Sequence, residues 1–251
     1  MTYEELYDEW INQPYADSCT EKFEIRDGIA IIPEGTTKIG NYAFDDCTSL
    51  ESVTIPESVT EIGNCAFFRC ASLKNIAIPK SVTEIGDNAF DGCSSLESIT
   101  LPESVASIGW YAFTGCKSLK NVTLPDSVTF LGEKAFSDCT SLESITISKS
   151  VTLIQHYTFN YCRSLKSITI PESVREIEEY AFEGCTSLTT VILPVRMRDI
   201  NLTAFYKCPS LSTIYVPAKT TYYYIELLPE KLHDKIAELA PEKKTKTEKE
   251  C

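Results

Sequence analysis

Hydrophobic and polar positions alternate over one short stretch early in the chain. Val53 and Ile55 alternate with Ser52 and Thr54, and a period of two is typical of a β-strand with one buried face. Pro56 follows directly, and proline has no N–H group to donate to a neighbouring strand, so we expect the strand to end there. The pattern therefore predicts a short strand with its apolar face toward a core and its polar face exposed.

The period changes in the residues that follow this strand. In the stretch SVTEIG, we expect Val59 and Ile62 to point inward and Gly63 to permit a tight turn. The next motif, AFxxC, places its apolar residues at positions i, i+1 and i+4. This spacing predicts one turn of short helix on the outside of the unit.

The same pattern returns every 23 residues as LxxVxIPxSVTxIGxxAFxxCxS, and a fixed period is typical of repeat architectures. One column holds Phe44, Phe67, Phe90, Phe113, Phe136, Phe159, Phe182 and Phe205, and another holds Cys47, Cys70, Cys93, Cys116, Cys139, Cys162, Cys185 and Cys208. Units of this length cannot fold back as hairpins, so we expect them to coil, with each strand parallel to its equivalent about 4.8 Å away. The sequence thus predicts an α/β solenoid in which equivalent side chains lie over one another.

Both ends of such an array would expose apolar cross-sections, so we expect a cap at each end. At the start, Thr2 and Glu5 have the spacing of a capping box, and Tyr3, Leu6 and Trp10 share one helical face. These residues predict a helix that covers the first unit.

At the other end, Pro229 suits a first helical position, and Leu232, Ile236 and Leu239 follow the helical spacing i, i+4, i+7. The last residues are strongly charged, and we expect them to be disordered. The predicted organisation is an N-terminal helical cap at 1–24, repeats of 23 residues at 25–219, a C-terminal helical cap at 220–240 and a disordered tail at 241–251.

The run LPESVASIGWYAFTGCKSLKNVTLPDSV resembles the BspA-like leucine-rich repeat family, also called the TpLRR class. The resemblance extends over about residues 30–217, with eight copies of AFxxC or its TFxxC variant. Departures from the repeat are Gln155 and Glu178 at the glycine position, Thr158 for alanine and Ser148 for proline. We expect the local turn geometry to differ at these positions.

The resemblance implies a right-handed, curved leucine-rich repeat array with a parallel β-sheet on the concave face and short helices or turns on the convex side. It also implies a protein without enzymatic activity, at the cell surface or secreted, that binds host proteins, matrix components or other cells. The family has no universal binding residues, so the resemblance assigns none.

Charge and hydropathy exclude some partners. The formal net charge is −13, which repels phosphate backbones, so we expect no nucleic-acid partner. No apolar run approaches the roughly 18 residues of a membrane helix, so we expect no membrane insertion. The residues MTYEELYDEW lack a basic segment followed by an apolar one, so the sequence as written shows no secretion signal.

The cysteine column does not predict a metal site or disulfide bonds. A line of single thiols without histidine does not supply tetrahedral ligands, and we expect buried free thiols that act as small apolar side chains. Cys19, Cys65 and Cys251 lie off the column and are the plausible reactive thiols. No cofactor is expected.

The sequence does not predict an enzyme. Serine occupies whole columns of the repeat, but the chain has only His156 and His233 as histidine bases and no G-x-S-x-G turn. Hydroxyl groups that satisfy the backbone at coil corners explain these serines better.

Two surfaces are candidates for binding. The exposed side of the strands forms a candidate concave face, with Thr54, Thr100, Thr123, Thr146, Thr169, Ile192 and Tyr215. This small, hydroxyl-rich surface suits an extended protein segment or a glycan, and it is equally consistent with ordinary strand-forming residues.

The second surface is a flank patch, formed by Trp110, Tyr111, Phe130, Leu153, His156 and Tyr157. Exposed apolar clusters often mark partner surfaces. The alternative is that these side chains pack on one another over the corner left by Gln155 and Thr158.

The sequence leaves three functional hypotheses. The first is a non-catalytic interaction and adhesion module, monomeric, that binds a host matrix or cell-surface protein. The second is a carbohydrate-binding or carbohydrate-cleaving solenoid, although cleavage needs two carboxylates on a groove floor. The third is a structural element whose arrays join end to end.

Overall fold

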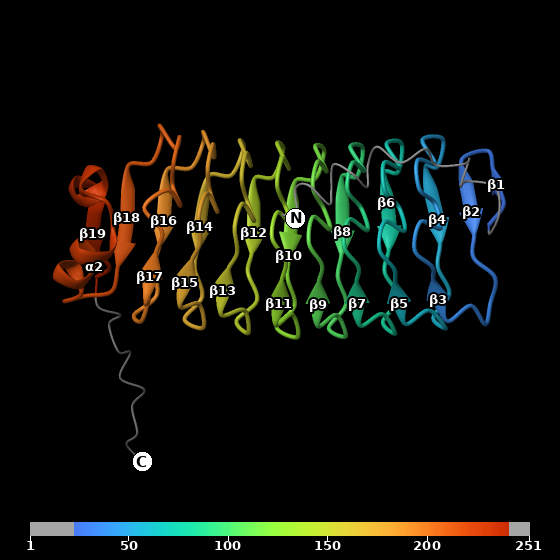
Figure 1. Ribbon diagram of the computed structural model, residues 1–251, viewed down its shortest axis with the longest axis horizontal. Helices are drawn as coiled ribbons and strands as arrows, with labels where there is room; N and C mark the ends of the chain where they lie inside the picture. Colours follow the sequence, from blue (N-terminus) through green and yellow to red (C-terminus); the bar gives the residue numbers. More distant parts are fainter. Residues whose placement is uncertain (1–22, 241–251) are drawn as a thin grey trace, which may run out of the picture.

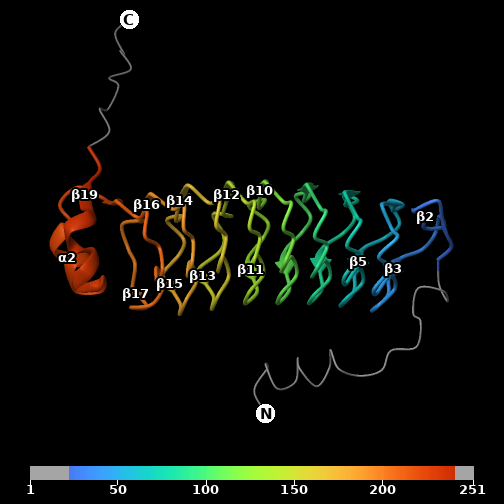
Figure 2. The same cartoon turned by 90° about the horizontal axis from the view of Figure 1, so that it is seen from above.

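A computed structural model describes residues 23–240 as a stack of coils, each with one long and one short strand. The long strands are β2 (Ile29–Ile31), β4 (Ser52–Thr54), β6 (Asn75–Ala77), β8 (Ser98–Thr100), β10 (Asn121–Thr123), β12 (Ser144–Thr146), β14 (Ser167–Thr169), β16 (Thr190–Ile192) and β18 (Thr213–Val216). The short strands are β3 (Lys38–Ile39), β5 (Glu61–Ile62), β7 (Glu84–Ile85), β9 (Ser107–Ile108), β11 (Phe130–Leu131), β13 (Leu153–Ile154), β15 (Glu176–Ile177) and β17 (Asp199–Ile200). The two sets form separate rows along the stack, which is nearly straight in both views (Figures 1 and 2).

Most equivalent strands of successive coils pair in parallel, and the long-strand row is interrupted between β8 and β10 and between β12 and β14. Asn75 pairs with Ser98 and Asn121 with Ser144, each 23 residues further along the chain. At the start, β1 (Ile25–Arg26) pairs antiparallel with β2. The predicted coiling with parallel pairing is therefore confirmed, while the hand of the coil stays an implication of the resemblance.

The core is a set of stacked columns. The ring centroids of successive phenylalanines lie 5.0–5.9 Å apart with nearly parallel planes, from Phe44 to Phe205. Phe23, which lies outside the repeat pattern, adds one more ring at 5.2 Å from Phe44. Because each ring is packed between its neighbours, the predicted stacking of Phe upon Phe is confirmed.

The AFxxC segment forms turns and not the predicted turn of helix. In each unit except the last, two residues near this motif adopt a left-handed backbone, as at Cys65 and Arg69 with φ of 54° for both. Their N–H groups donate to the next coil, from Cys65 to Asp87 at 2.8 Å and from Arg69 to Asp91 at 2.7 Å. A helix would direct these N–H groups to carbonyls four residues earlier in the same segment, so bonding between coils replaces it.

The cysteine column contributes hydrogen bonds between coils. From Cys70 to Cys208, each thiol donates to the carbonyl oxygen of the phenylalanine 26 residues earlier, at 3.0–3.3 Å. Burial raises the pKa of all these thiols, so they are protonated donors at neutral pH. The predicted free, buried thiols are confirmed from Cys70 to Cys185, and Cys208 is free but half-buried.

Two cysteine predictions are wrong. Cys47, the first of the column, is disulfide-bonded. Cys65 is only 2% exposed, and burial raises the pKa of its thiol, so it lacks the thiolate character of a reactive cysteine. Cys19 and Cys251 lie outside the described residues.

Close contact between coils explains the glycine column at the end of the short strands. A Cβ atom on Gly132 would lie 2.5 Å from the carbonyl carbon of Gly109 in the coil before it. Such a contact with backbone cannot be relieved by moving a side chain, so the close approach requires glycine. The run of glycines ends at Gln155, and the same column continues with Glu178 and Asn201.

A junction in the short-strand row coincides with this change of residue. The short strands pair in two groups, from β3 to β11 and from β13 to β17. Gly132 donates its backbone N–H to Ile108 at 2.9 Å, whereas the side-chain amide of Gln155 donates to the carbonyl of Leu131 at 3.0 Å. The Phe136 to Phe159 ring spacing across this junction is 5.9 Å, the widest in the stack. The expectation of altered geometry at Gln155 is therefore confirmed.

The C-terminal end carries helix α2 (Thr221–Leu227), a 3₁₀ helix at Glu230–Lys235 and strand β19 (Ile236–Glu238). β19 pairs in parallel with β18, so it adds a strand to the long-strand row, and α2 lies beside it beyond the last coil (Figure 2). Only Leu232 of the three residues with helical spacing lies in a helix, because Ile236 begins the strand. The N-terminal cap residues and the charged tail lie outside the described residues, and the domain boundaries stay a prediction.

Candidate functional site

The long strands present one exposed face. Thr54, Thr100, Thr123, Thr146 and Thr169 are all exposed on it, and Ile192 and Tyr215 are half-buried. Alternate residues of each strand point into the core, which explains why this column shares one surface. The structure therefore places the predicted concave-face residues along a single side of the array.

This face is hollowed near its C-terminal end. A groove of about 610 Å³ lies over β12, β14 and β16, and we call it the C-terminal groove. Of the predicted face, Thr146, Thr169 and Ile192 line it, and Pro217 and Leu239 complete its wall. Leu239 is held there because its backbone N–H donates to the carbonyl of Val216 at 2.8 Å.

Hydroxyl and apolar groups dominate the C-terminal groove. The hydroxyl of Ser144 donates to the side-chain oxygen of Asn121 at 2.6 Å, and Ser167 stands in the same column one coil further on. The charged lining residues are Lys149 and Glu172. Lys149 is paired with Asp126 at 3.3 Å, so the groove offers hydrogen bonds and apolar contact more than charge.

The residues that line the C-terminal groove do not form the arrangements used for glycoside cleavage or acyl transfer. Among the described residues that line it, none is histidine or cysteine, and Glu172 is the one carboxylate. Glycoside cleavage needs two carboxylates, and acyl transfer needs a nucleophile with a base. The arrangement can bind an extended ligand, and it supplies no acid–base pair.

The structure divides the predicted flank patch into two groups. Trp110 and Phe130 are each 40% exposed, whereas Tyr111 is 4% exposed. Leu153 is half-buried next to the junction that follows β11. Trp110 and Phe130 are thus the members of the patch that present most surface to a partner.

The remaining aromatic residues of the patch belong to a column on the turn side. The Lys134 ammonium lies 4.9 Å from the ring centroid of Tyr111 and 5.0 Å from that of Tyr157. It also donates to the Tyr111 hydroxyl at 2.9 Å, and Tyr157 stacks on Tyr180 with centroids 5.2 Å apart. Sequence reasoning missed Lys134 and Tyr180, although both follow in the same column at intervals of 23 residues.

His156 contributes to packing at the junction. Its Nε2 atom lies 3.4 Å from the carboxylate of Glu178, and its backbone N–H donates to the same carboxylate at 3.1 Å. Thr158 donates its hydroxyl to the carbonyl of Gln155 at 2.7 Å. These contacts favour mutual packing over partner binding for the His156 and Tyr157 part of the patch.

Residues 23–240 contain neither a metal-binding cluster nor a helix suited to a membrane. No group of three or more His, Cys, Asp or Glu side chains there has an arrangement suited to a metal ion. No helix in that range combines the length and apolarity of a membrane span.

Comparison with protein-family models identifies the repeat. The model described as the BspA type leucine rich repeat region matches residues 28–143 and 131–227, in six copies. The chain belongs to the BspA-type leucine-rich repeat family. The resemblance seen in the sequence is thereby confirmed, and membership supports a repeat-based protein-interaction module.

Solved structures of other leucine-rich repeat proteins have the same fold. A leucine-rich repeat protein from Bacteroides ovatus is 29% identical over 84% of this chain and 69% of its own, with a TM-score of 0.61. A leucine rich cell surface protein from Faecalibacterium prausnitzii is 33% identical over 80% of this chain and 62% of its own, with a TM-score of 0.54. The T. pallidum leucine-rich repeat protein TpLRR is 29% identical over 70% of this chain and 91% of its own, with a TM-score of 0.60. No curated protein matched the chain.

Proposed function

We propose that this leucine-rich repeat protein is a non-catalytic adhesion module that binds a host matrix or cell-surface protein in the C-terminal groove. The observation that carries the proposal is the groove itself, where a hollow of about 610 Å³ lies on the exposed face of the long strands. Thr146, Thr169 and Ile192 place hydroxyl and apolar groups in successive coils. An extended segment of a protein ligand offers backbone and side-chain groups that suit such a surface.

Rigidity of the coils supports this function. Hydrogen bonds between turns, between strands and from thiols to carbonyls join each coil to the next. A surface that is already ordered loses little conformational entropy when a ligand docks. The similarity to a cell surface protein of Faecalibacterium prausnitzii supports a location outside the cell. We propose that the chain acts there as a monomer.

The experiment measures capture of purified matrix and cell-surface proteins by the immobilised chain. The groove variant is T169D/I192D, which places carboxylates on the groove floor. The matched control is T54D/T100D, which changes the same column outside the groove. We expect a ligand that binds the wild type and the control to bind the groove variant at least about tenfold more weakly, since each buried unpaired charge destabilises the complex strongly. Equal capture by both variants would exclude the groove.

The carbohydrate-cleaving hypothesis receives no support from the groove, because a single carboxylate lines it. A glycan array tests binding directly, and a positive glycan signal that T169D/I192D removes would replace the protein ligand in the proposal. Light scattering over a range of concentrations tests end-to-end assembly, since a constant monomer mass excludes it.

A further inference from the structure

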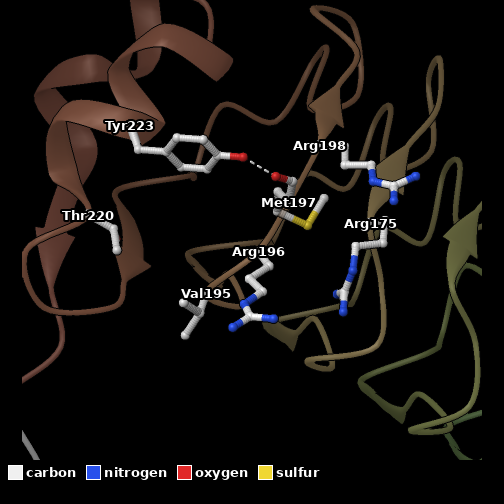
Figure 3. A pocket seen from close by; sticks show the side chains of 7 residues that line it. All are labelled: Arg175, Val195, Arg196, Met197, Arg198, Thr220 and Tyr223. Atoms are coloured by element: carbon white, nitrogen blue, oxygen red, sulfur yellow. Dashed lines mark hydrogen bonds between the residues drawn. The ribbon is translucent and has the colours of Figure 1, made fainter.

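Three of the six arginines of the chain gather at one corner of the last coils. Arg175, Arg196 and Arg198 line a cavity of about 470 Å³ together with Tyr223 of α2 (Figure 3). We call this feature the arginine corner. It lies on a chain with a net charge of −13, so a local concentration of guanidinium groups needs a physical explanation.

The arginines are departures from the repeat. The column of Arg196 holds serine in the six preceding units, at Ser58, Ser81, Ser104, Ser127, Ser150 and Ser173. The column of Arg198 holds Thr129 and Thr152 before it changes to Arg175 and Arg198. Coils without these arginines form equally well, so the fold of a coil does not require them.

The C-terminal segment fixes the shape of the arginine corner. The hydroxyl of Tyr223 donates to the carbonyl of Met197 (Figure 3), and that of Tyr224 donates to the carbonyl of Pro194. Both carbonyls belong to the segment that carries Arg196. The corner is therefore held against α2 before any ligand arrives, which lowers the entropy lost on binding.

The guanidinium groups of the corner are not neutralised by the described residues. Within residues 23–240, no carboxylate lies within ion-pair distance of Arg175, Arg196 or Arg198. Arg175 donates to the carbonyls of Glu172 and Val174, at 2.6 and 3.0 Å. Arg175 and Arg196 extend to the same side of the corner in Figure 3. Planar guanidinium groups bind carboxylates through paired hydrogen bonds, so the corner suits an anionic ligand.

The arginine corner adjoins the C-terminal groove. Glu172, which lines the groove, accepts a hydrogen bond at 3.1 Å from the backbone N–H of Val195, which lines the corner. Its carboxylate is thus engaged with backbone at the boundary between the two hollows. A single extended ligand can therefore occupy the groove and continue to the arginines.

We infer that the arginine corner recognises an acidic segment of the protein ligand, with its aspartate or glutamate side chains on Arg196 and on its neighbours in the corner, Arg175 and Arg198. This inference rests on the proposed function, because continuity with the C-terminal groove selects a peptide over other anions. The hydroxyl and apolar contacts of the groove have low specificity, and the corner adds a requirement for negative charge on the ligand. The corner would therefore select acidic ligands among those that the groove accepts.

The test is calorimetric titration of the full chain with an acetylated hexaglutamate peptide, and with hexaglutamine as the neutral peptide. The variant R196S/R198T restores the serine and threonine of the other coils, so it should fold. The control R163S/K80S removes two positive charges from elsewhere on the array. Separate titrations with a heparin hexasaccharide and with sodium sulfate test whether the corner binds an acidic glycan or a free inorganic anion.

We expect hexaglutamate to bind the wild type and the control, and to bind R196S/R198T about 100-fold more weakly, at about tenfold for each arginine. Binding should also weaken as salt is raised, because exposed charges are screened. Equal binding to R196S/R198T, equal binding of hexaglutamine, or binding of only heparin or sulfate would overturn the inference. The groove variant T169D/I192D, tested with the intact protein ligand, examines the proposed function separately. Failure of the acidic-peptide inference therefore leaves the groove proposal standing, and failure of the groove proposal leaves the peptide titration to be judged by itself.

Discussion

The glycine column of the short strands can be tested by one substitution at two positions. A Cβ atom on Gly86 would lie 2.6 Å from the carbonyl carbon of Gly63, and one on Gly132 would lie 2.5 Å from that of Gly109. The local clash is therefore the same in G86Q and G132Q. The positions differ because Gly132 borders the existing junction before Gln155, whereas Gly86 lies inside the run of glycines.

The expected magnitudes follow from the number of junctions. G132Q moves the existing junction back by one coil, so the free energy of unfolding should change by less than about 1 kcal/mol. G86Q creates a new junction between β5 and β7, because its Cβ atom would clash with Gly63 of the preceding coil. This junction weakens one or two hydrogen bonds between strands, such as that from Gly86 to Ile62 at 2.8 Å, at about 0.5–1.5 kcal/mol each. G86Q should therefore be less stable than G132Q by about 0.5–3 kcal/mol.

Urea unfolding followed by far-ultraviolet circular dichroism measures this difference. Replacing a glycine lowers the conformational entropy of the unfolded chain, and this change is the same in both variants. It therefore cancels in the comparison. Hydrogen exchange at the amide of residue 86 provides a local check, because G86Q should lose protection there. Equal stability of the two variants, or a lower stability of G132Q, would refute the explanation of the junction.

Three further expectations concern the flank patch, the thiols and a buried carboxylate. W110S/F130S should unfold like the wild type, since both side chains are 40% exposed, and unchanged ligand capture by it would remove Trp110 and Phe130 from the binding surface. Labelling of the native protein with a thiol reagent, mapped by mass spectrometry, should modify Cys208 before the fully buried Cys139, because burial raises the pKa of Cys208 only to about 11. Early modification of Cys139 would contradict its position in the core. Burial raises the pKa of Asp45 to about 6, so the folded chain holds this proton more tightly than the unfolded chain, and its stabilising effect is lost as pH rises through about 6. The melting temperature of the wild type should therefore fall more than that of D45N between about pH 4 and pH 7. An identical pH profile for the two proteins would show that Asp45 is not responsible.

Much of the core could be predicted from the sequence because one period controls it. The positions of Phe67 and Phe90 in the stack follow from their separation of 23 residues, since equivalent side chains of a coil must meet. The turn at AFxxC was not predicted, because its helical spacing competes with hydrogen bonds to the next coil. The glycines in the column before the cysteine indicated a turn at this place, since Gly92, Gly115 and Gly184 all have positive φ.

The candidate sites depend on contacts that the repeat does not encode. Thr146 and Thr169 look like Thr54 and Thr100 in the sequence, and the wall formed by Pro217 and Leu239 distinguishes the groove from the rest of the face. The arginine corner had a sequence signal in the change from serine to arginine at Arg196. Its enclosure by Tyr223 required the structure.

The sequence by itself determined the coil, the buried columns and the exposed face, because a 23-residue period fixes which side chains lie over one another. The tertiary structure alone decided where the array is hollowed and which residues enclose the arginine corner. Those features arise where the repeat meets the non-repeating C-terminal segment, and the docking of Tyr223, Tyr224 and Leu239 depends on the combined surface of several coils. A local pattern specifies a coil, whereas a groove needs surfaces from residues that are far apart in the chain.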